Sequence, residues 1–269
     1  MRKKYKYLSA LLLPISLLIF YRHEIIWLFQ TWIYEGYDSY GYIALIAFVL
    51  YCWKNKFSLK RGDIRILYVL FTVCLISIFI KRLDINIISA LMLITALSLL
   101  LYYYFNEGMR QNWTSLLLLF LMIPWTHHIN IFAGFTLRRI STLIAASILR
   151  LYHIQADVQG TMLFLGDMRL EVGAPCSGSK YLFFTAFFLI IMGLFIRQKS
   201  LLFLPLSLAV AMGCNILRIV SIALLRIFLQ GEEGMFFHNI IGLFYFSIAL
   251  TGVYLLCRKI TELKLPWLS

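Results

Sequence analysis

The chain has 269 residues, of which 62% are hydrophobic and only 14% are charged. Soluble domains average about 45–50% apolar and about 25% charged residues, so this composition excludes an ordinary soluble domain and indicates an integral membrane protein. The net charge of +13 does not indicate nucleic-acid binding, because most basic residues lie in short clusters between apolar runs, as membrane topology requires.

The first half of the chain contains five apolar runs that we expect to cross the membrane. The basic segment Met1–Tyr7 precedes the run Leu8–Tyr21, which we interpret as an uncleaved first span because no small-residue cleavage site follows it. The basic loop Lys54–Arg65 is predicted to be cytoplasmic. The other expected spans are Ser39–Trp53, Ile64–Ile80, Ile85–Phe105 and Thr114–Trp125, the last extended to His128 to reach a sufficient length.

Residues 129–175 differ from the apolar runs on either side. Arginines interrupt Leu137–Leu151, which is predicted to be an amphipathic helix that lies along the outer surface, or dips into the membrane and returns. The alternating segment after it predicts a short β-hairpin. Its strands are Met162–Leu165 and Met168–Val172, joined by the turn Gly166-Asp167.

Three further spans are expected at Tyr181–Ile196, Leu201–Leu229 and Met235–Leu256. The predicted fold is an all-α membrane protein, a bundle of about eight transmembrane helices with an outer-face amphipathic helix and a short β-hairpin. We expect one multi-pass domain over residues 1–269. Its parts are the N-terminal spans (1–128), an outer-face segment (129–175), core spans (176–258) and a cytoplasmic tail (259–269). Placing the basic clusters inside puts both termini in the cytoplasm and residue 176 at the outer face.

Metal and disulfide sites are not indicated by the cysteines and histidines. The five cysteines show no CxxC spacing, and the five histidines form no HExxH pattern. His127 and His128 are adjacent, and adjacent residues on a helix point apart. We therefore expect neither a metal site nor a disulfide framework.

Cys176 is the strongest candidate nucleophile. It lies in the short polar segment Glu171–Lys180, EVGAPCSGSK, which runs directly into an apolar stretch. Unpaired N–H groups at a helix N-terminus carry partial positive charge, so they favour a thiolate and can hold an oxyanion. The alternative is that Cys176 is a small buried residue beside a turn. Ser177 is a second possible nucleophile, although no base is better placed for it.

Two polar residues interrupt the apolar runs that follow Cys176. A charge inside a membrane span is costly, which makes Arg218 a candidate functional residue, and Asn215 lies one helical turn before it on the same face. His238 begins the last span. Under the predicted topology, Cys176, Arg218 and His238 reach the outer leaflet from three successive helices. The alternatives are an arginine that reaches the interface or pairs with a glutamate, and an interfacial histidine without a chemical role.

Cysteine, histidine and arginine together suit acyl transfer through a thioester. The thiolate attacks a carbonyl carbon, the histidine returns a proton to the leaving amine, and the guanidinium stabilises the charge on the tetrahedral oxygen. If water accepts the acyl group, the enzyme is a peptidase. If an amine or another nucleophile accepts it, the enzyme is a transpeptidase.

These motifs resemble those of the exosortase/archaeosortase family, whose multi-pass membrane proteins are similar to sortases in chemistry but not in fold. The matching segments, in the family's order, are Cys176-Ser177-Gly178, Asn215-Ile216-Leu217-Arg218, and His238 with Gly242 four residues later. The segment Tyr37–Gly41 resembles the family's early D-x-x-x-G segment more weakly, since two residues and not three separate Asp38 from Gly41. Ser179-Lys180 departs from the family pattern, in which an apolar residue commonly follows, and this leaves the subfamily open.

The resemblance implies an enzyme of the cytoplasmic (inner) membrane of a prokaryote that processes exported proteins. Its substrates would carry a C-terminal sorting tail made of a short signal, a membrane helix and a basic end. The enzyme would cut near the signal on the outer face and pass the new C-terminus to an acceptor nucleophile. No nucleic acid and no cofactor are implied.

The carried-over roles are Cys176 as nucleophile, Arg218 as oxyanion stabiliser and His238 as acid and base. Supporting roles are expected for neighbouring residues. Asn215 would orient Arg218, and Glu171, Glu232 or Glu233 would orient His238; the alternative for each glutamate is a solvated surface carboxylate. Ser177 and Gly178 of the cysteine motif are further supporting residues.

Other classes of protein stay open at this stage. A transporter or channel would use Arg218 and His238 as intramembrane polar sites, although the sequence shows no internal repeat and no matching pair of broken spans. A transferase acting on a lipid carrier would need carboxylate pairs or a metal, which are scarce here. A structural assembly factor would not need Cys176 at all.

Overall fold

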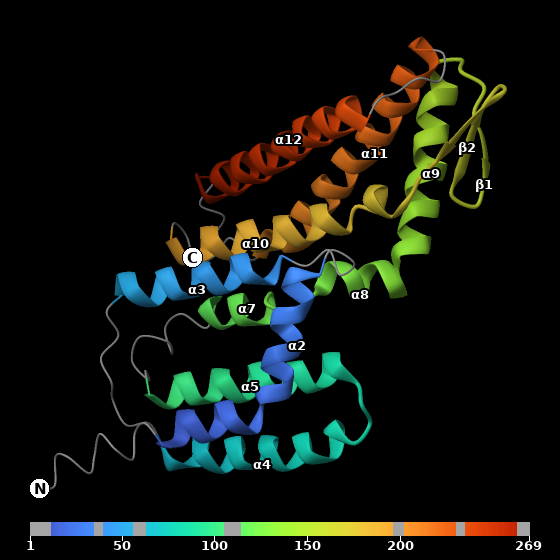
Figure 1. Ribbon diagram of the computed structural model, residues 1–269. Helices are drawn as coiled ribbons and strands as arrows, with labels where there is room; N and C mark the ends of the chain where they lie inside the picture. The colour runs from blue at the N-terminus through green and yellow to red at the C-terminus, as the bar shows by residue number, and fades with distance from the viewer. Residues whose placement is uncertain are drawn as a thin grey trace, which may run out of the picture. The chain divides into compact units, whose positions relative to one another are not determined.

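The computed structural model describes residues 12–34, 40–55, 63–104, 114–195, 202–229 and 235–262, and it is mostly helical (Figure 1). The chain divides into two compact units, Met1–Trp125 and Thr126–Ser269. Several predicted features lie outside the described residues: the basic segment 1–7, most of the basic loop 54–65, the loops at 106–113 and 197–200, Glu232 and Glu233, and the end of the cytoplasmic tail.

The first unit is a set of packed helices. They are a helix over Leu12–Phe20, α2 (Arg22–Ile33), α3 (Gly41–Asn55), α4 (Ile64–Lys81), α5 (Asn86–Tyr104) and α7 (Thr114–Phe120). Helix α4 pairs with α5, α5 also packs on α2 and α7, and α3 packs on α7 (Figure 1). The helices predicted at Ile64–Ile80 and Ile85–Phe105 are confirmed as α4 and α5, both long and apolar enough to cross a membrane.

The first span was predicted to end at Tyr21. In the structure the helix over Leu12–Phe20 is followed directly by α2, with a bend of 67° between the two helices. A buried ion pair that the sequence analysis missed lies at this bend. Lys81 Nζ donates to the Phe20 carbonyl at 2.6 Å and lies 3.2 Å from the carboxylate of Glu24. Burying a carboxylate is costly unless a cation accompanies it, so Lys81 both satisfies a backbone carbonyl and neutralises Glu24.

The prediction of one span over Thr114–His128 is wrong. Helix α7 ends at Phe120, and a separate helix, α8 (Trp125–Phe132), begins after Pro124. Proline lacks an N–H group, and its ring disfavours helical geometry in the residue before it. The indole N–H of Trp125 donates to the Phe120 carbonyl at 2.6 Å. This contact satisfies a carbonyl that the interruption removes from helical pairing.

The interruption between α7 and α8 also explains why position 41, in the weakly matching segment Tyr37–Gly41, is a glycine. The Trp32 indole donates to the Met122 carbonyl at 3.0 Å, and a Cβ added at Gly41 would overlap that carbonyl oxygen. Only glycine therefore fits at the start of α3. Asp38 of the same motif lies outside the described residues.

The second unit contains four long helices and a small sheet. Its elements are α8, α9 (Gly134–Leu151), β1 (Asp157–Gln159), β2 (Met162–Leu165), β3 (Met168–Glu171), the 3-10 turn η2 (Ala174–Cys176), α10 (Ser179–Phe195), α11 (Leu204–Phe228) and α12 (Met235–Glu262). Helix α11 packs against α9, α10 and α12 (Figure 1). The three predicted C-terminal helices are found as α10, α11 and α12.

Four described helices are long and apolar enough to cross a membrane, and two bent helix pairs meet the same standard when each pair is taken as one segment. Helices α8 and α9 form one such pair, with a bend of 72°, as in a broken span or a re-entrant loop. The helix predicted at Leu137–Leu151 is found as α9. The count of eight spans and the depth of α9 in the membrane stay predictions.

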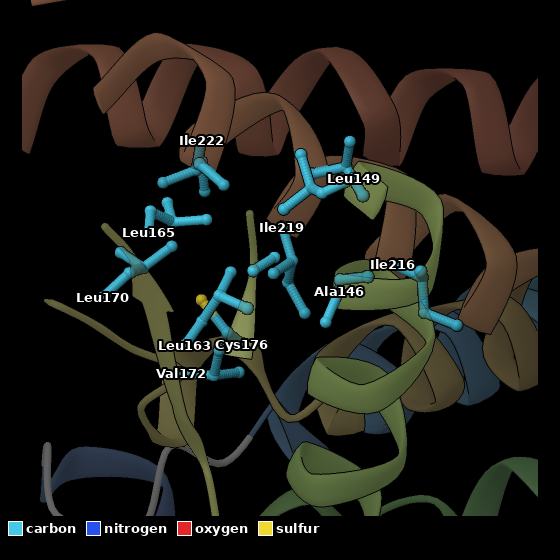
Figure 2. Close-up of a cluster of buried hydrophobic side chains, with 14 residues drawn as sticks. Ala146, Leu149, Leu163, Leu165, Leu170, Val172, Cys176, Ile216, Ile219 and Ile222 are labelled. Atoms are coloured by element: carbon cyan, nitrogen blue, oxygen red, sulfur yellow. The ribbon is translucent and has the colours of Figure 1, made fainter. Parts of the chain in front are cut away.

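The predicted hairpin is confirmed: β2 and β3 pair antiparallel with Leu165 opposite Met168 across the Gly166-Asp167 turn. A third strand, β1, was not predicted and completes a sheet of order β1-β2-β3. The core-facing side chains of the sheet pack against α9 and α11, and Cys176 lies in the same cluster (Figure 2). The labelled members are Ala146, Leu149, Leu163, Leu165, Leu170, Val172, Cys176, Ile216, Ile219 and Ile222.

Candidate active site

Cys176 ends the 3-10 turn η2 and therefore precedes α10, whereas the sequence predicted it at the helix N-terminus. The Cys176 N–H donates to the Gly173 carbonyl, and the Ser177 N–H donates to the Ala174 carbonyl. These two backbone donors are engaged inside the turn. They do not supply the oxyanion donors that the sequence analysis expected from a helix end.

Two side chains of α11 hold this turn in place. Asn215 Nδ2 donates to the Cys176 carbonyl at 2.9 Å, and Arg218 Nη1 donates to the Pro175 carbonyl at 3.3 Å. Residues three apart on a helix share a face, so the Asn-x-x-Arg spacing presents two donors to consecutive carbonyls. Asn215 was expected to orient Arg218, but the hydrogen bond that the structure gives it goes to the cysteine backbone instead.

Cys176, Arg218 and His238 meet at a single nitrogen atom. Arg218 Nη2 lies 2.8 Å from His238 Nε2, and Cys176 Sγ lies 3.9 Å from the same Nε2. Guanidinium nitrogens only donate, so Nε2 is the acceptor and the proton of the neutral imidazole is on Nδ1. The structure therefore brings together the three residues that the sequence singled out, from η2, α11 and α12.

Gly242 lies one helical turn after His238 and contacts the same guanidinium. A Cβ added at Gly242 would lie 3.3 Å from Arg218 Nε and 3.4 Å from both Cζ and Nη2, which is closer than an ordinary contact. The Tyr181 hydroxyl also donates to the Gly242 carbonyl at 3.0 Å. The His-x-x-x-Gly spacing thus places two residues of one α12 face against Arg218.

Ser177 and Gly178 shape the chain after the cysteine. Gly178 has a φ of +84°, and a Cβ there would lie 3.2 Å from Asn215 Nδ2, so a larger residue would be strained. The Ser177 hydroxyl donates to Asn130 Oδ1 at 2.7 Å. This engagement argues against Ser177 as a nucleophile. Asn130 was missed by the sequence analysis.

Arg218 and Asn215 each have one buried polar atom that makes no hydrogen bond to any described part of the chain. Arg218 is 7% exposed, and its Nε has no hydrogen-bond partner among the described residues; the same is true of Asn215 Oδ1. An unsatisfied buried polar atom costs about 1–3 kcal/mol. Such atoms in a native structure need an explanation, and a polar group of a bound substrate is one.

A partly open cavity of about 260 Å³ lies beside the cysteine. Residues from the sheet, the turn, α11 and α12 line it: Leu170, Glu171, Val172, Cys176, Ile219, Ile222, Arg226 and His238. Small-molecule sites usually measure about 300–1,000 Å³, so this cavity lies just below that range. In the part of the chain that the structure describes, no three metal-ligating side chains cluster.

Glu171 and Arg218 do not make the contacts at the cavity that the sequence analysis expected. Glu171 lines the cavity, but no hydrogen bond joins it to His238 among the described residues. Arg218 is not part of the lining, and its terminal nitrogens donate to His238 and to the Pro175 carbonyl. Its guanidinium must therefore exchange partners before it can reach a substrate oxygen in the cavity.

Fold and site together define a multi-pass membrane protein in which a thiol, an imidazole and a guanidinium meet beside a small cavity. A family model described as transmembrane exosortase matches residues 32–255, which include every residue of this cluster. The chain belongs to the transmembrane exosortase family, as the motifs predicted. No curated protein and no solved structure matches it.

Proposed function

We propose that the protein is a membrane-embedded cysteine transpeptidase that cleaves the C-terminal sorting tail of exported proteins through a thioester on Cys176. The observation that carries the proposal is the convergence of Cys176 Sγ and Arg218 Nη2 on His238 Nε2, beside a partly open cavity of about 260 Å³. Membership of the exosortase family supports the substrate class.

The first step forms the thioester. His238 Nε2 takes the thiol proton, and the Cys176 sulfur bonds to the scissile carbonyl carbon. The carbon–nitrogen bond then breaks as the imidazolium returns the proton to the leaving amine. The tail leaves with a new amino terminus, and the exported protein stays bound to Cys176. An acceptor amine or water then attacks the thioester carbon and restores the thiol.

Arg218 links proton transfer to charge stabilisation. Because Nε2 accepts a hydrogen bond from Arg218 in this structure, His238 can take the thiol proton only after that hydrogen bond opens. The released guanidinium nitrogen then has a donor for the oxygen that becomes negative in the tetrahedral intermediate. One movement of Arg218 would thus free the base and supply the oxyanion donor.

The test follows an exported protein with such a tail, encoded in the same genome and carrying an epitope tag at its N-terminal end. We expect wild-type protein to shorten it, and Cys176→Ala, His238→Ala and Arg218→Ala to leave it uncut. Cys214→Ala is the matched control, because Cys214 is a buried thiol of α11 in a different packing cluster, and it should retain processing.

The thioester itself gives a second measurement. A hydroxylamine-sensitive adduct between the enzyme and the exported protein should form with wild-type enzyme and disappear with Cys176→Ala. Processing that survives Cys176→Ala would contradict the proposal. It would favour a protein that uses Arg218 and His238 for transport.

A further inference from the structure

Strand β3 is an edge strand whose outer backbone groups face away from β2. The sheet order β1-β2-β3 leaves one side of β3 without a described partner strand. Leu165 and Met168 flank the two-residue turn, and antiparallel pairs alternate between bonded and non-bonded positions. The N–H and C=O groups of Arg169 and Glu171 therefore point outward. The bond from Val172 N to Thr161 O at 3.0 Å fits this alternation.

Strand β3 borders the cavity that contains Cys176. Glu171, one of the two β3 residues with outward-facing backbone groups, lines this cavity together with Leu170, Val172 and Cys176. Helix α11 contributes Ile219 and Ile222 to the same lining. A chain bound along the outer edge of β3 would therefore lie beside the cavity that contains the sulfur.

The backbone groups on the outer edge of β3 favour an extended peptide as the ligand. Alternating N–H and C=O groups match the backbone of an extended peptide, whereas a lipid chain offers nothing to pair with them. Strand addition to a sheet edge is an established mode of peptide recognition, in which backbone hydrogen bonds give affinity and pockets for alternate side chains give specificity. An edge strand at a membrane surface also has unpaired backbone N–H and C=O groups, which cost free energy. Hydrogen bonds to a bound peptide would remove that cost.

We propose that the exported protein binds as an added strand on the outer edge of β3, which delivers its scissile carbonyl to Cys176. The inference rests on the proposed transpeptidase function and adds the mode of substrate binding. Side chains of the added strand alternate, so every second one enters the cavity against Leu170, Ile219 and Ile222. The enzyme then selects apolar substrate side chains at alternate positions and accepts varied side chains at the positions between them.

Proline substitution tests the backbone contact. Glu171→Pro removes an outward-facing N–H and leaves the β2–β3 bonds in place. Val158→Pro is the matched control, because Val158 lies opposite Leu163 in β1 and its N–H faces outward from the other edge of the sheet. Losing one or two backbone hydrogen bonds should lower the processing rate about tenfold in Glu171→Pro. Val158→Pro should keep more than half of it.

The alkylation rate of Cys176 and the rate of tail processing together distinguish a wrong binding mode from a wrong function. The rate at which N-ethylmaleimide alkylates Cys176 reports an intact site, and it should match wild type in Glu171→Pro. If Glu171→Pro processes the tail like wild type while Cys176→Ala does not, strand addition is wrong and the transpeptidase function stands. If Cys176→Ala also processes the tail, the function itself is wrong.

Photo-crosslinking gives a test that does not depend on turnover. A benzophenone amino acid replaces Arg169 in β3 or, as the control, Gln159 in β1, in a Cys176→Ala background; both native side chains are exposed. The tagged exported protein should crosslink through position 169 and not through position 159. Equal crosslinking at the two positions, or none at 169, would overturn the proposal.

Discussion

Arg218 donates from its two terminal nitrogens to different parts of the chain. One donates to the Pro175 carbonyl before the cysteine, and the other donates to His238 on α12. The guanidinium is planar and permanently charged, so a single side chain serves both partners at fixed angles. A lysine ammonium at the same place cannot reach both in this geometry.

Arg218→Lys should therefore lose activity although it keeps the charge. We expect the rate of tail processing to fall about 100-fold or more, the usual effect of losing an oxyanion donor. Immunoblotting of membranes should show wild-type accumulation, because the substitution keeps a positive charge on a long side chain at this position. Wild-type processing by Arg218→Lys would assign Arg218 a purely structural role.

Gly242→Ala tests the contact that explains the glycine of the last motif. The added methyl group would lie 3.3–3.4 Å from the guanidinium of Arg218 and displace it from His238. Small displacements at a reacting centre cost up to about 100-fold in rate, so we expect processing to fall at least tenfold. Gly252→Ala on the same helix is the control, since its Cβ would meet Val210 at an ordinary 3.6 Å. Equal activity in the two variants would contradict this account.

Sequence spacing predicted which site residues share a helix face, but not what they contact. Intervals of three and four residues are local properties of a helix, and they place Asn215 with Arg218 and His238 with Gly242. The partner of Asn215, the Cys176 carbonyl, depends on how η2 packs on α11. The hydrogen bond from Ser177 to Asn130 joins residues 47 positions apart and leaves no local signal.

Elements with strong local signals were predictable, and those defined by their neighbours were not. Gly166-Asp167 between alternating residues marks the hairpin, whereas β1 has only three residues and forms by pairing with β2. Pro124 marked the break between α7 and α8, but the apolar run around it resembles a continuous span. The Trp125 indole that stabilises the break acts across the interruption, which composition does not show.

Trp125→Phe should destabilise this break. It removes the shorter of the two hydrogen bonds to the Phe120 carbonyl while keeping an aromatic ring, and the longer bond from the Ile123 N–H at 3.4 Å remains. The expected cost is that of one hydrogen bond, about 0.5–1.5 kcal/mol. We expect a lower melting temperature for the detergent-purified variant. Trp53→Phe is the control, because Trp53 is 78% exposed and should tolerate the change. An unchanged melting temperature for Trp125→Phe would show that the indole contact contributes little.

At the scale of the whole molecule, the basic clusters predict that the sheet of the second unit faces the outside of the cell. A cysteine at the exposed position of Gln159 should react with a membrane-impermeant maleimide in intact cells, in a Cys176→Ala background. A cysteine replacing Lys54 should react only after permeabilisation. The reverse pattern would invert the proposed topology and move the site to the cytoplasmic face.

The two contacts of α12 with Arg218 depend on the register of α12 against α11. Sliding α12 by one residue, about 1.5 Å with a rotation of about 100°, would take both His238 and Gly242 away from the guanidinium. The register of α12 on α11 is therefore part of the active site, because a shift by one residue would separate the imidazole from both the guanidinium and the thiol.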